Sequence, residues 1–490
     1  MHENVKINNL PEANASSLPR WRGFNLLEKS SVDHAAPFLG DDFRWISELG
    51  FNFVRLPMDY RCWINNNDWN SINEDVLKEI DQAVSWGRQY NIHVCLNFHR
   101  APGYCIVNPD MFDLWTDPEV QRVCARHWAL FAKRYAGIPN KHLSFNLLNE
   151  PFATSNQRYM HVVQILADAI RREDPARLII ADGVFIGMKP APELAGLGVA
   201  QSTRGYLPWG VSQYHASWID GADRMPRPQW PYPLIPGYLY GPAKPELAGP
   251  LRIKGDFSEK TALRLHVQVV SDFVQLLVRA DGREICSWLL RSGSGKGEWK
   301  ESIYNEEYGI YQNVFDRDYV IDLPAQTGEI EIEAIQGDWL SFSELTFTPQ
   351  DPCYEQTRII NPTVPYWGYW GIKQTGLFIE KNGDVKTRED ACIDRAWLRR
   401  EYIEPWLDLQ RNGVGVMVGE WGAYDKTPHD VALSWMRDCL ENWREAGWGW
   451  VLWNFRGSFG PLDSNRVDVK YEDFHGHQLD RKMLTLLEEY

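Results

Sequence analysis

The stretch His142-Leu-Ser-Phe-Asn-Leu-Leu-Asn-Glu-Pro151 decides how the rest of the chain is interpreted. It begins as an apolar run of the length of a buried strand and ends in an amide, a carboxylate and a proline. A charged glutamate at the end of a buried strand is costly unless it is hydrogen-bonded, paired or used in chemistry. Asn149 and Glu150 are therefore the first candidates for a functional site.

A second stretch has the same pattern far along the chain. Val414-Gly-Val-Met-Val-Gly-Glu-Trp-Gly422 is again an apolar run that ends in a glutamate, Glu420. Two strands that each deliver one carboxylate provide the two groups needed to hydrolyse a glycosidic bond. The sequence therefore predicts that Glu150 and Glu420 work as a pair.

Apolar strand patterns alternate with helical patterns, such as residues 73–90 and 118–135, through most of the chain. This alternation predicts a parallel sheet with helices outside, and eight such units predict a closed (β/α)8 barrel, the TIM barrel of the α/β class. Besides the opening stretch, the predicted strands cover residues 21–27, 51–57, 92–99, 177–182, 209–215, 414–420 and 448–455.

The alternation is interrupted by a different kind of segment. Residues 246–350 contain alternating apolar and polar runs without a clear helix, which predicts an all-β sandwich inserted after the sixth barrel strand. We therefore assign residues 20–245 and 351–490 to the barrel and the polar residues 1–19 to an N-terminal arm. The insert either binds carbohydrate, through Trp288, Trp299 or Trp339, or is a rim domain that shapes the barrel mouth or an oligomer contact. Its position after strand six favours the shaping role.

In a parallel α/β barrel the active site lies at the carboxyl ends of the strands. We expect Glu150 to protonate the leaving oxygen and Glu420 to attack the anomeric carbon. An arginine could hold one carboxylate ionised, and an asparagine could bind the sugar 2-hydroxyl. The candidates at the other predicted strand ends are Arg55, His99, Asn149, His215 and Trp453.

The motifs Asn149-Glu-Pro151, Val54-Arg-Leu-Pro57, Asn97-Phe-His-Arg-Ala-Pro-Gly103 and Gly419-Glu-Trp-Gly422, followed by Trp453, together resemble glycoside hydrolase family 5. This is the cellulase family of retaining (β/α)8 glycosidases. The resemblance runs from about Trp21 to Phe455, apart from the insert.

The resemblance implies specific roles at the matching positions. Glu150 looks like the acid/base, Glu420 like the nucleophile and Asn149 like the contact to the 2-hydroxyl. Arg55, His99 and His215 look like supporting polar groups. Trp453 looks like the floor under the sugar that is cleaved, and Trp421 is a further candidate for a substrate contact.

The chain departs from the family pattern after strand six. The family usually has His-x-Tyr there, with the tyrosine bonded to the nucleophile, whereas this chain reads Gln213-Tyr-His-Ala-Ser-Trp218. Either Tyr214 or a residue beyond the insert takes the role of that tyrosine, or the nucleophile is tuned differently.

Composition limits the classes of partner. The formal net charge of −15 argues against nucleic acid, and no apolar run approaches the length of a membrane span. The 23 tryptophans favour a sugar-binding groove, because their flat faces stack on sugar rings. We expect neither a metal nor a cofactor. The absence of a recognisable signal peptide and the scattered cysteines favour the cytoplasm, with secretion as the alternative if a leader precedes this sequence.

Three functions remain open at this stage. The first is a retaining hydrolase of β-glucan or gluco-oligosaccharides, and the second is a β-mannanase or other β-hexosidase with the same mechanism. The third is a glycan-binding protein on an inactive barrel, in which Glu150 and Glu420 have only structural roles. The sequence leaves endo or exo action and the oligomeric state undecided.

Overall fold

The computed structural model describes residues 10–107, 109–219, 221–350, 357–366, 369–380, 384–388 and 391–490. The chain divides into two compact units. The first contains the residues up to Tyr206 and Arg395–Tyr490, and the second contains Leu207–Asp394. The second unit is longer at both ends than the insert expected at residues 246–350.

The described part of the first unit contains a closed barrel of eight parallel strands, which confirms the predicted (β/α)8 fold. Neighbouring strands follow the chain order around the barrel. In that order the strands are β1 (Arg22–Asn25), β2 (Phe53–Asp59), β5 (His93–Arg100), β6 (Leu143–Asn146), β7 (Ile179–Asp182), β8 (Ala200–Gly205), β21 (Val416–Trp421) and β22 (Trp450–Leu452).

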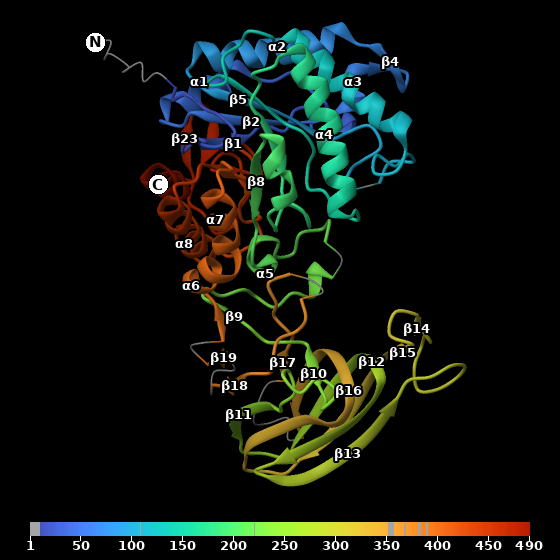
Figure 1. Ribbon diagram of the computed structural model, residues 1–490. Helices are drawn as coiled ribbons and strands as arrows, with labels where there is room; N and C mark the ends of the chain where they lie inside the picture. The colour runs from blue at the N-terminus through green and yellow to red at the C-terminus, as the bar shows by residue number, and fades with distance from the viewer. Residues whose placement is uncertain are drawn as a thin grey trace. The chain divides into compact units, whose positions relative to one another are not determined.

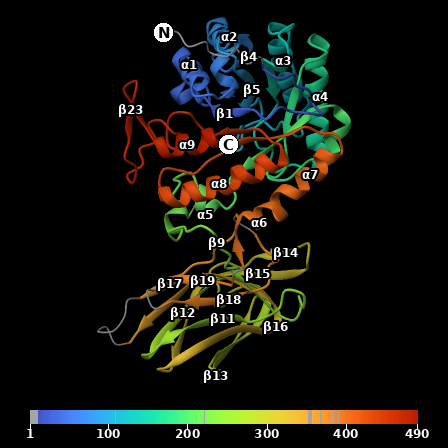
Figure 2. The same cartoon turned by 90° about the vertical axis from the view of Figure 1, so that its left-hand side faces the viewer.

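The helices that cover the barrel begin with the caps expected from the sequence. Asn73 accepts hydrogen bonds from the first turn of α2, and Asp117 does the same for α3, whose first residue is Pro118. Helices α7 and α8 lie next to each other on the outside of the barrel (Figure 1, Figure 2). The helices of this unit are α1 (Gly40–Glu48), α2 (Glu74–Gln89), α3 (Pro118–Arg134), α4 (Asn156–Glu173), α6 (Arg395–Trp397), α7 (Glu404–Arg411), α8 (His429–Ala446) and α9 (Arg481–Glu489).

The two ends of the barrel differ in polarity. A cluster of buried apolar residues that includes Trp21, Phe53, Met417 and Val451 fills the interior toward the amino ends of the strands. The described part of the predicted arm packs against this cluster through Ala13. Buried polar side chains gather toward the carboxyl ends instead, which makes that end the place for chemistry.

The sixth strand is not where the sequence predicted it. Residues 209–215 are not a strand, because Trp209–Ser212 forms the short helix α5, and the sixth barrel strand is β8. Strand β8 reads Ala-Gln-Ser-Thr-Arg-Gly, and its polar side chains are buried but hydrogen-bonded. Gln201, for example, exchanges two hydrogen bonds with the backbone of Ala191. Hydrophobicity therefore gave no signal for this strand.

The second unit is built on two long antiparallel strands, β12 (Thr261–Ala280) and β16 (Thr327–Pro349). The first half of β12 also pairs with β15 (Ile310–Leu323), whereas its second half pairs with β13 (Arg283–Arg291). Register shifts interrupt the β12–β16 ladder, and both strands curve in Figure 1. Their inner faces supply a continuous apolar core, consistent with the predicted sandwich.

The remaining strands of the second unit are short and mostly flank the two long ones. They are β9 (Tyr232–Pro233), β10 (Tyr238–Tyr240), β11 (Leu251–Phe257), β14 (Tyr304–Asn305), β17 (Arg358–Ile360), β18 (Gly376–Ile379), β19 (Val385–Thr387) and β20 (Cys392–Ile393). Two hairpins of the first unit complete the strands: β3 (Ile64–Asn65) with β4 (Asp68–Ile72), and β23 (Glu472–Phe474) with β24 (His477–Leu479). No helix in the described ranges is both long and apolar enough to cross a membrane.

Candidate active site

Arg55 lies at the centre of the polar end of the barrel. This arginine is 1% exposed, and its guanidinium donates hydrogen bonds to side chains from several other strands or strand ends. Its Nη1 lies 3.1 Å from Glu420 Oε2, and its Nη2 lies 2.8 Å from Asn149 Oδ1. Nε and Nη1 also donate to Asn146 and Asn25. Arg55 thus fixes the geometry of the site and places a positive charge beside Glu420.

Glu420 is held through both of its carboxylate oxygens. It is 5% exposed on β21, where Oε2 accepts from Arg55 and Oε1 accepts from the hydroxyl of Tyr206 at 3.0 Å. Burial, followed by the Glu420 charge, raises the pKa of Tyr206 well above its ordinary value, so the phenol keeps its proton and donates it. Two donors that hold both carboxylate oxygens in place suit Glu420 to act as a nucleophile.

Glu150 follows β6 in a turn and has a φ of 51°, in the left-handed region that non-glycine residues rarely adopt. The turn is held on both sides of the residue. The Glu150 N–H donates to Asp182 Oδ2 at 2.9 Å, and the Glu150 carbonyl accepts from the Tyr104 hydroxyl at 2.6 Å. Strained backbone that is fixed by neighbouring groups is typical of functional sites.

The Glu150 carboxyl group has the electrostatic environment of an acid. Burial raises its pKa to about 8, and the negative charge of Glu420 acts in the same direction. Arg204 opposes this rise, because its Nε lies 3.1 Å from Glu150 Oε1. The site therefore contains two carboxyl groups whose surroundings differ, which is the arrangement that separates an acid from a nucleophile.

Arg204 also fixes the spacing of the two carboxyl groups. Its Nε lies 3.1 Å from Glu150 Oε1 and 3.7 Å from Glu420 Oε2. Because two sides of a triangle limit the third, these two oxygens are at most about 7 Å apart, below most of the range of about 6.5–9.5 Å found in inverting glycosidases.

Sequence reasoning missed Arg204 and Tyr206 because it missed strand β8. These residues form Arg204-Gly-Tyr206 at the end of the sixth strand, with the spacing of the family's His-x-Tyr but with arginine in place of histidine. Tyr206 therefore takes the role of the tyrosine that could not be located. Asp182 was also missed; it lies at the end of β7 and pairs with Arg204. A search for the x-Tyr spacing upstream of residue 209 would have found the pair.

The Asn149 amide is oriented by two arginines, and its interaction with the side chain of His99 acts to raise the pKa of that histidine against the larger effect of burial. Asn149 Oδ1 accepts hydrogen bonds from Arg55 and Arg204, both at 2.8 Å. These two donors determine the orientation of the amide, so that Nδ2 points away from both guanidinium groups. This buried Nδ2 has no hydrogen-bond partner among the residues that the structure describes. An oriented donor without a partner is consistent with the predicted contact to a sugar hydroxyl.

His99 and Trp453 form a stacked pair, with ring centroids 5.5 Å apart and an interplanar angle of 29°. Both rings are half-buried, at the carboxyl ends of β5 and β22. Burial, followed by the charges of Arg55 and Arg204, lowers the pKa of His99 well below its ordinary value, so the imidazole is neutral. The part of Trp453 that remains exposed is available as a platform for a sugar ring.

The predicted substrate contact of Trp421 is corrected by the structure. Its side chain is 0% exposed and packs against Trp435, Trp443 and Trp450. Successive side chains of a strand point to opposite faces, so the residue after the inward-facing Glu420 points outward, toward the helices. Trp421 therefore belongs to the packing between barrel and helices.

Tyr214 and His215 were chosen because residues 209–215 were expected to form strand six. They lie instead in the second compact unit, just after α5, with their rings 4.0 Å apart. The premise of that choice was wrong, and the position expected for His215 is occupied by Arg204. A substrate contact of Tyr214 or His215 stays a prediction.

No group of three or more His, Cys, Asp or Glu side chains that could hold a metal ion occurs in the part of the chain that the structure describes.

Residues 20–214 match the family model described as "Cellulase (glycosyl hydrolase family 5)". The barrel belongs to glycoside hydrolase family 5. The family 5 chain is 32% identical to Endoglucanase C of Acetivibrio thermocellus over 154 residues, which are 31% of this chain and 45% of that protein. It is also 32% identical to Cellodextrinase A of Ruminococcus flavefaciens over 111 residues, 22% of this chain and 32% of the relative. The chain thus spans less than half the length of these relatives.

Among solved structures, one described as a glycoside hydrolase is similar over almost the whole length. Its TM-score is 0.60 at 28% sequence identity, and the match covers 96% of this chain and 99% of the other. This similarity therefore extends over both units of the family 5 chain, including the inserted one.

Proposed function

We propose that the protein is a retaining β-glycosidase that hydrolyses β-glucan or gluco-oligosaccharides by a double displacement through Glu150 and Glu420. The observation that carries this proposal is the different environment of the two carboxyl groups. Glu420 accepts hydrogen bonds from Arg55 and Tyr206, whereas burial and the Glu420 charge keep Glu150 protonated to about pH 8. Arg204 Nε contacts both carboxyl groups, and the short separation between them that follows supports a retaining mechanism.

In the first step, a Glu420 oxygen attacks the anomeric carbon and the bond to the leaving oxygen breaks. Glu150 donates its proton to that oxygen, so the released fragment leaves as an alcohol. The products are a glycosyl ester on Glu420 and an ionised Glu150. The oriented Nδ2 of Asn149 donates to the 2-hydroxyl, a contact that strengthens as charge develops on the ring.

Formation of the ester removes the negative charge of Glu420. That charge is the second largest cause of the raised pKa of Glu150, so the pKa of Glu150 falls once the intermediate has formed. Glu150 is then suited to accept a proton from water, which attacks the anomeric carbon and releases the sugar with its original configuration. The same pair of residues therefore serves both steps.

The glucan assignment rests on the relatives rather than on the geometry. Two of the relatives are named an endoglucanase and a cellodextrinase, and the family match at residues 20–214 contains the acid/base motif. The proposed substrates are therefore the polymer and its short oligomers.

The test is an activity screen on aryl β-glucosides, cello-oligosaccharides, soluble β-glucans and β-mannan. We expect turnover of at least one glucosidic substrate and its loss in Glu420→Ala and Glu150→Gln, with the fold retained by circular dichroism. Turnover of mannan alone would show that the protein uses the same mechanism on β-mannosides rather than on glucans. Binding without turnover on every substrate would favour a glycan-binding protein and refute the proposal.

A further inference from the structure

An aromatic strip lies on one face of the inserted unit, at the junction of β10 and β16. Tyr240 pairs with Trp339 and Tyr238 pairs with Ser341 across the two strands, so the three aromatic side chains share a face. The Tyr238 and Tyr240 rings are stacked, with centroids 5.9 Å apart at 15°. The Trp339 ring meets Tyr238 at 64° and 5.3 Å.

This strip forms one wall of a cavity of about 260 Å³. Two further aromatic residues line the cavity and are largely in contact with solvent: Trp370 is 69% exposed and Tyr308 is 62% exposed. The segment that carries Trp370 is attached to the strip, because the Gly371 N–H donates to the Tyr240 hydroxyl at 2.8 Å. Large aromatic rings left in solvent around a small cavity indicate a binding site rather than core packing.

Polar side chains at the edge of the cavity are held in fixed positions. The Asp338 carboxylate accepts a hydrogen bond from Ser271 Oγ at 2.6 Å. Gln312 donates to the same Oγ at 3.3 Å and accepts from Asn305 Nδ2 at 2.9 Å. Lys244 adds a cationic donor to the lining. Flat apolar faces with oriented polar groups at the edge match a pyranose ring, which has apolar C–H faces and equatorial hydroxyl groups.

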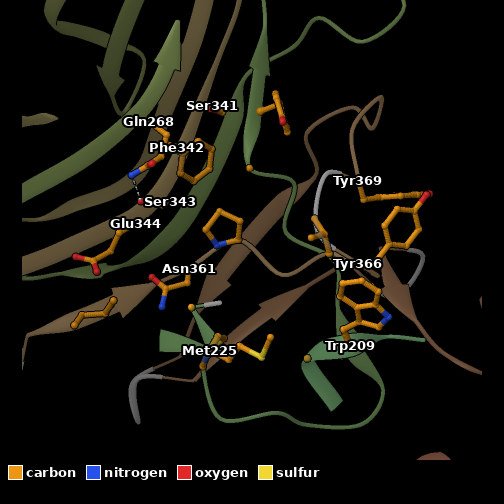
Figure 3. A pocket seen from close by; sticks show the side chains of 18 of the residues that line it. Trp209, Met225, Gln268, Ser341, Phe342, Ser343, Glu344, Asn361, Tyr366 and Tyr369 are labelled. Atoms are coloured by element: carbon orange, nitrogen blue, oxygen red, sulfur yellow. Dashed lines mark hydrogen bonds between the residues drawn. The ribbon is translucent and has the colours of Figure 1, made fainter. Parts of the chain in front are cut away.

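A larger cavity, of about 750 Å³, adjoins the first, and Tyr238 lines both. Figure 3 shows Trp209, Tyr366 and Tyr369 on one side of it, and Gln268, Ser343 and Glu344 on the other. The polar groups of this side are engaged within the protein, since Gln268 donates to Ser343 and Glu344 pairs with Arg264. A sugar chain that extends past Tyr238 would therefore enter a space with an aromatic side, so affinity should rise with chain length.

Two of the tryptophans that the sequence offered as sugar contacts have structural positions instead. Trp288 packs against the sandwich core next to Tyr319, and Trp299 packs against it next to Phe315. Neither residue lines the aromatic cavity. Trp339 is the one of the three candidates that does so, and the other two provide matched controls.

We propose that the inserted unit carries a glycan-binding site of its own, formed by Tyr238, Tyr240, Trp339 and Trp370, that takes a segment of a β-linked glucan chain. The site shares no residue with the barrel site. The choice of glucan as the occupant rests on the proposed function, because a chain that the barrel cleaves is the chain that a second site would retain. The aromatic and polar lining itself requires only pyranose rings.

The test is isothermal titration calorimetry of the full chain with cellohexaose, on a Glu420→Ala background that prevents cleavage. We expect two binding events, one of which weakens at least tenfold in Trp339→Ala and in Trp370→Ala. Because Trp370 is exposed, its replacement should leave the fold intact, which circular dichroism checks. Trp288→Ala, the matched control from the same sandwich, should keep both events.

Kinetics separate this inference from the proposed function. With Glu420 intact, Trp370→Ala should hydrolyse a small aryl β-glucoside like the parent but should lose activity on insoluble glucan at low substrate concentration. A single binding event, or two events that both survive in Trp339→Ala and Trp370→Ala, would overturn the second site. Absence of turnover, together with a binding event that Trp370→Ala removes, would refute the proposed function and support the site.

Discussion

Replacement of Arg204 by methionine is expected to move the basic limb of the pH profile to higher pH. The general acid must be protonated, so kcat/KM falls as the pH rises through the pKa of Glu150, near pH 8 in the parent protein. The Arg204 charge lowers this pKa, because it favours the ionised form of Glu150. Its removal raises the pKa, and activity therefore persists to higher pH.

The size of the effect follows from the distance between the two groups. Nε of Arg204 lies 3.1 Å from Glu150 Oε1. Opposite unit charges 4 Å apart attract by about 4 kcal/mol at an effective dielectric constant of about 20, and one pH unit corresponds to about 1.4 kcal/mol. Arg55 and entering water compensate part of the loss, so we expect the limb to rise by about one to two pH units.

The same substitution should also lower the maximal rate and the stability. Arg204 orients Asn149 and Glu150, and a displacement of about 1 Å at reacting groups costs on the order of 100-fold in rate. Its loss also leaves the buried Asp182 without its cation, which costs about 3–5 kcal/mol of folding free energy. The assay is therefore run well below the melting temperature of the variant, which circular dichroism measures.

Two further variants separate the effect of the Arg204 charge on the pH profile from the effect of a buried substitution on stability. Arg204→Lys keeps a positive charge but loses the planar fork, so its basic limb should stay near pH 8 while kcat falls. Arg177→Lys is the matched control, because Arg177 is also buried but binds Asp174 and backbone carbonyls away from the site. It should lose stability without a change in the pH profile. An unchanged or lowered basic limb in Arg204→Met would show that the Arg204 charge does not lower the pKa of Glu150.

Three other substitutions give separate expectations. Tyr206→Phe removes a hydrogen bond to a charged oxygen of Glu420, so kcat on an aryl β-glucoside should fall about 10- to 100-fold with little change in melting temperature. A kcat equal to that of the parent protein would contradict a role of Tyr206 in supporting the nucleophile. Trp421→Ala should lower the free energy of unfolding by about 3–5 kcal/mol in denaturant titrations, while KM stays constant. A raised KM in a variant that remains stable would show that Trp421 does contact the substrate. Trp453→Ala should lower kcat/KM about tenfold or more, in a variant whose fold circular dichroism shows to be intact. An unaffected kcat/KM would show that Trp453 is not a platform for a sugar ring.

The parts of the site that could be predicted from the sequence are those in which a polar residue ends an apolar strand. Glu150, Glu420 and Arg55 stand out because a charged residue next to a buried run requires a partner or a function. Strand β8 lacks this contrast, since its buried side chains Gln201, Thr203 and Arg204 are polar and receive their partners only in the folded barrel. Because strand β8 could not be recognised in the sequence, the site residues expected after strand six were assigned to Tyr214 and His215.

Two other features differ from the sequence-based prediction: the direction of the Trp421 side chain and the pairing of strands in the insert. Trp421 follows the nucleophile directly, but the alternation of strand side chains sends it into the helix packing, which proximity in sequence does not reveal. In the insert, alternating runs indicated strands, yet the strip of Tyr238, Tyr240 and Trp339 depends on a register between segments about 100 residues apart. That register joins two distant segments, and no local pattern contains it.

Trapping of the covalent intermediate tests the proposed role of Glu420 as the nucleophile. The protein is incubated with a 2-deoxy-2-fluoro-β-glucoside that has an activated leaving group, digested with a protease and mapped by mass spectrometry. We expect a single fluoroglucosyl label on Glu420. A label on Glu150 or elsewhere, or no label on protein that hydrolyses the parent glucoside, would contradict this role.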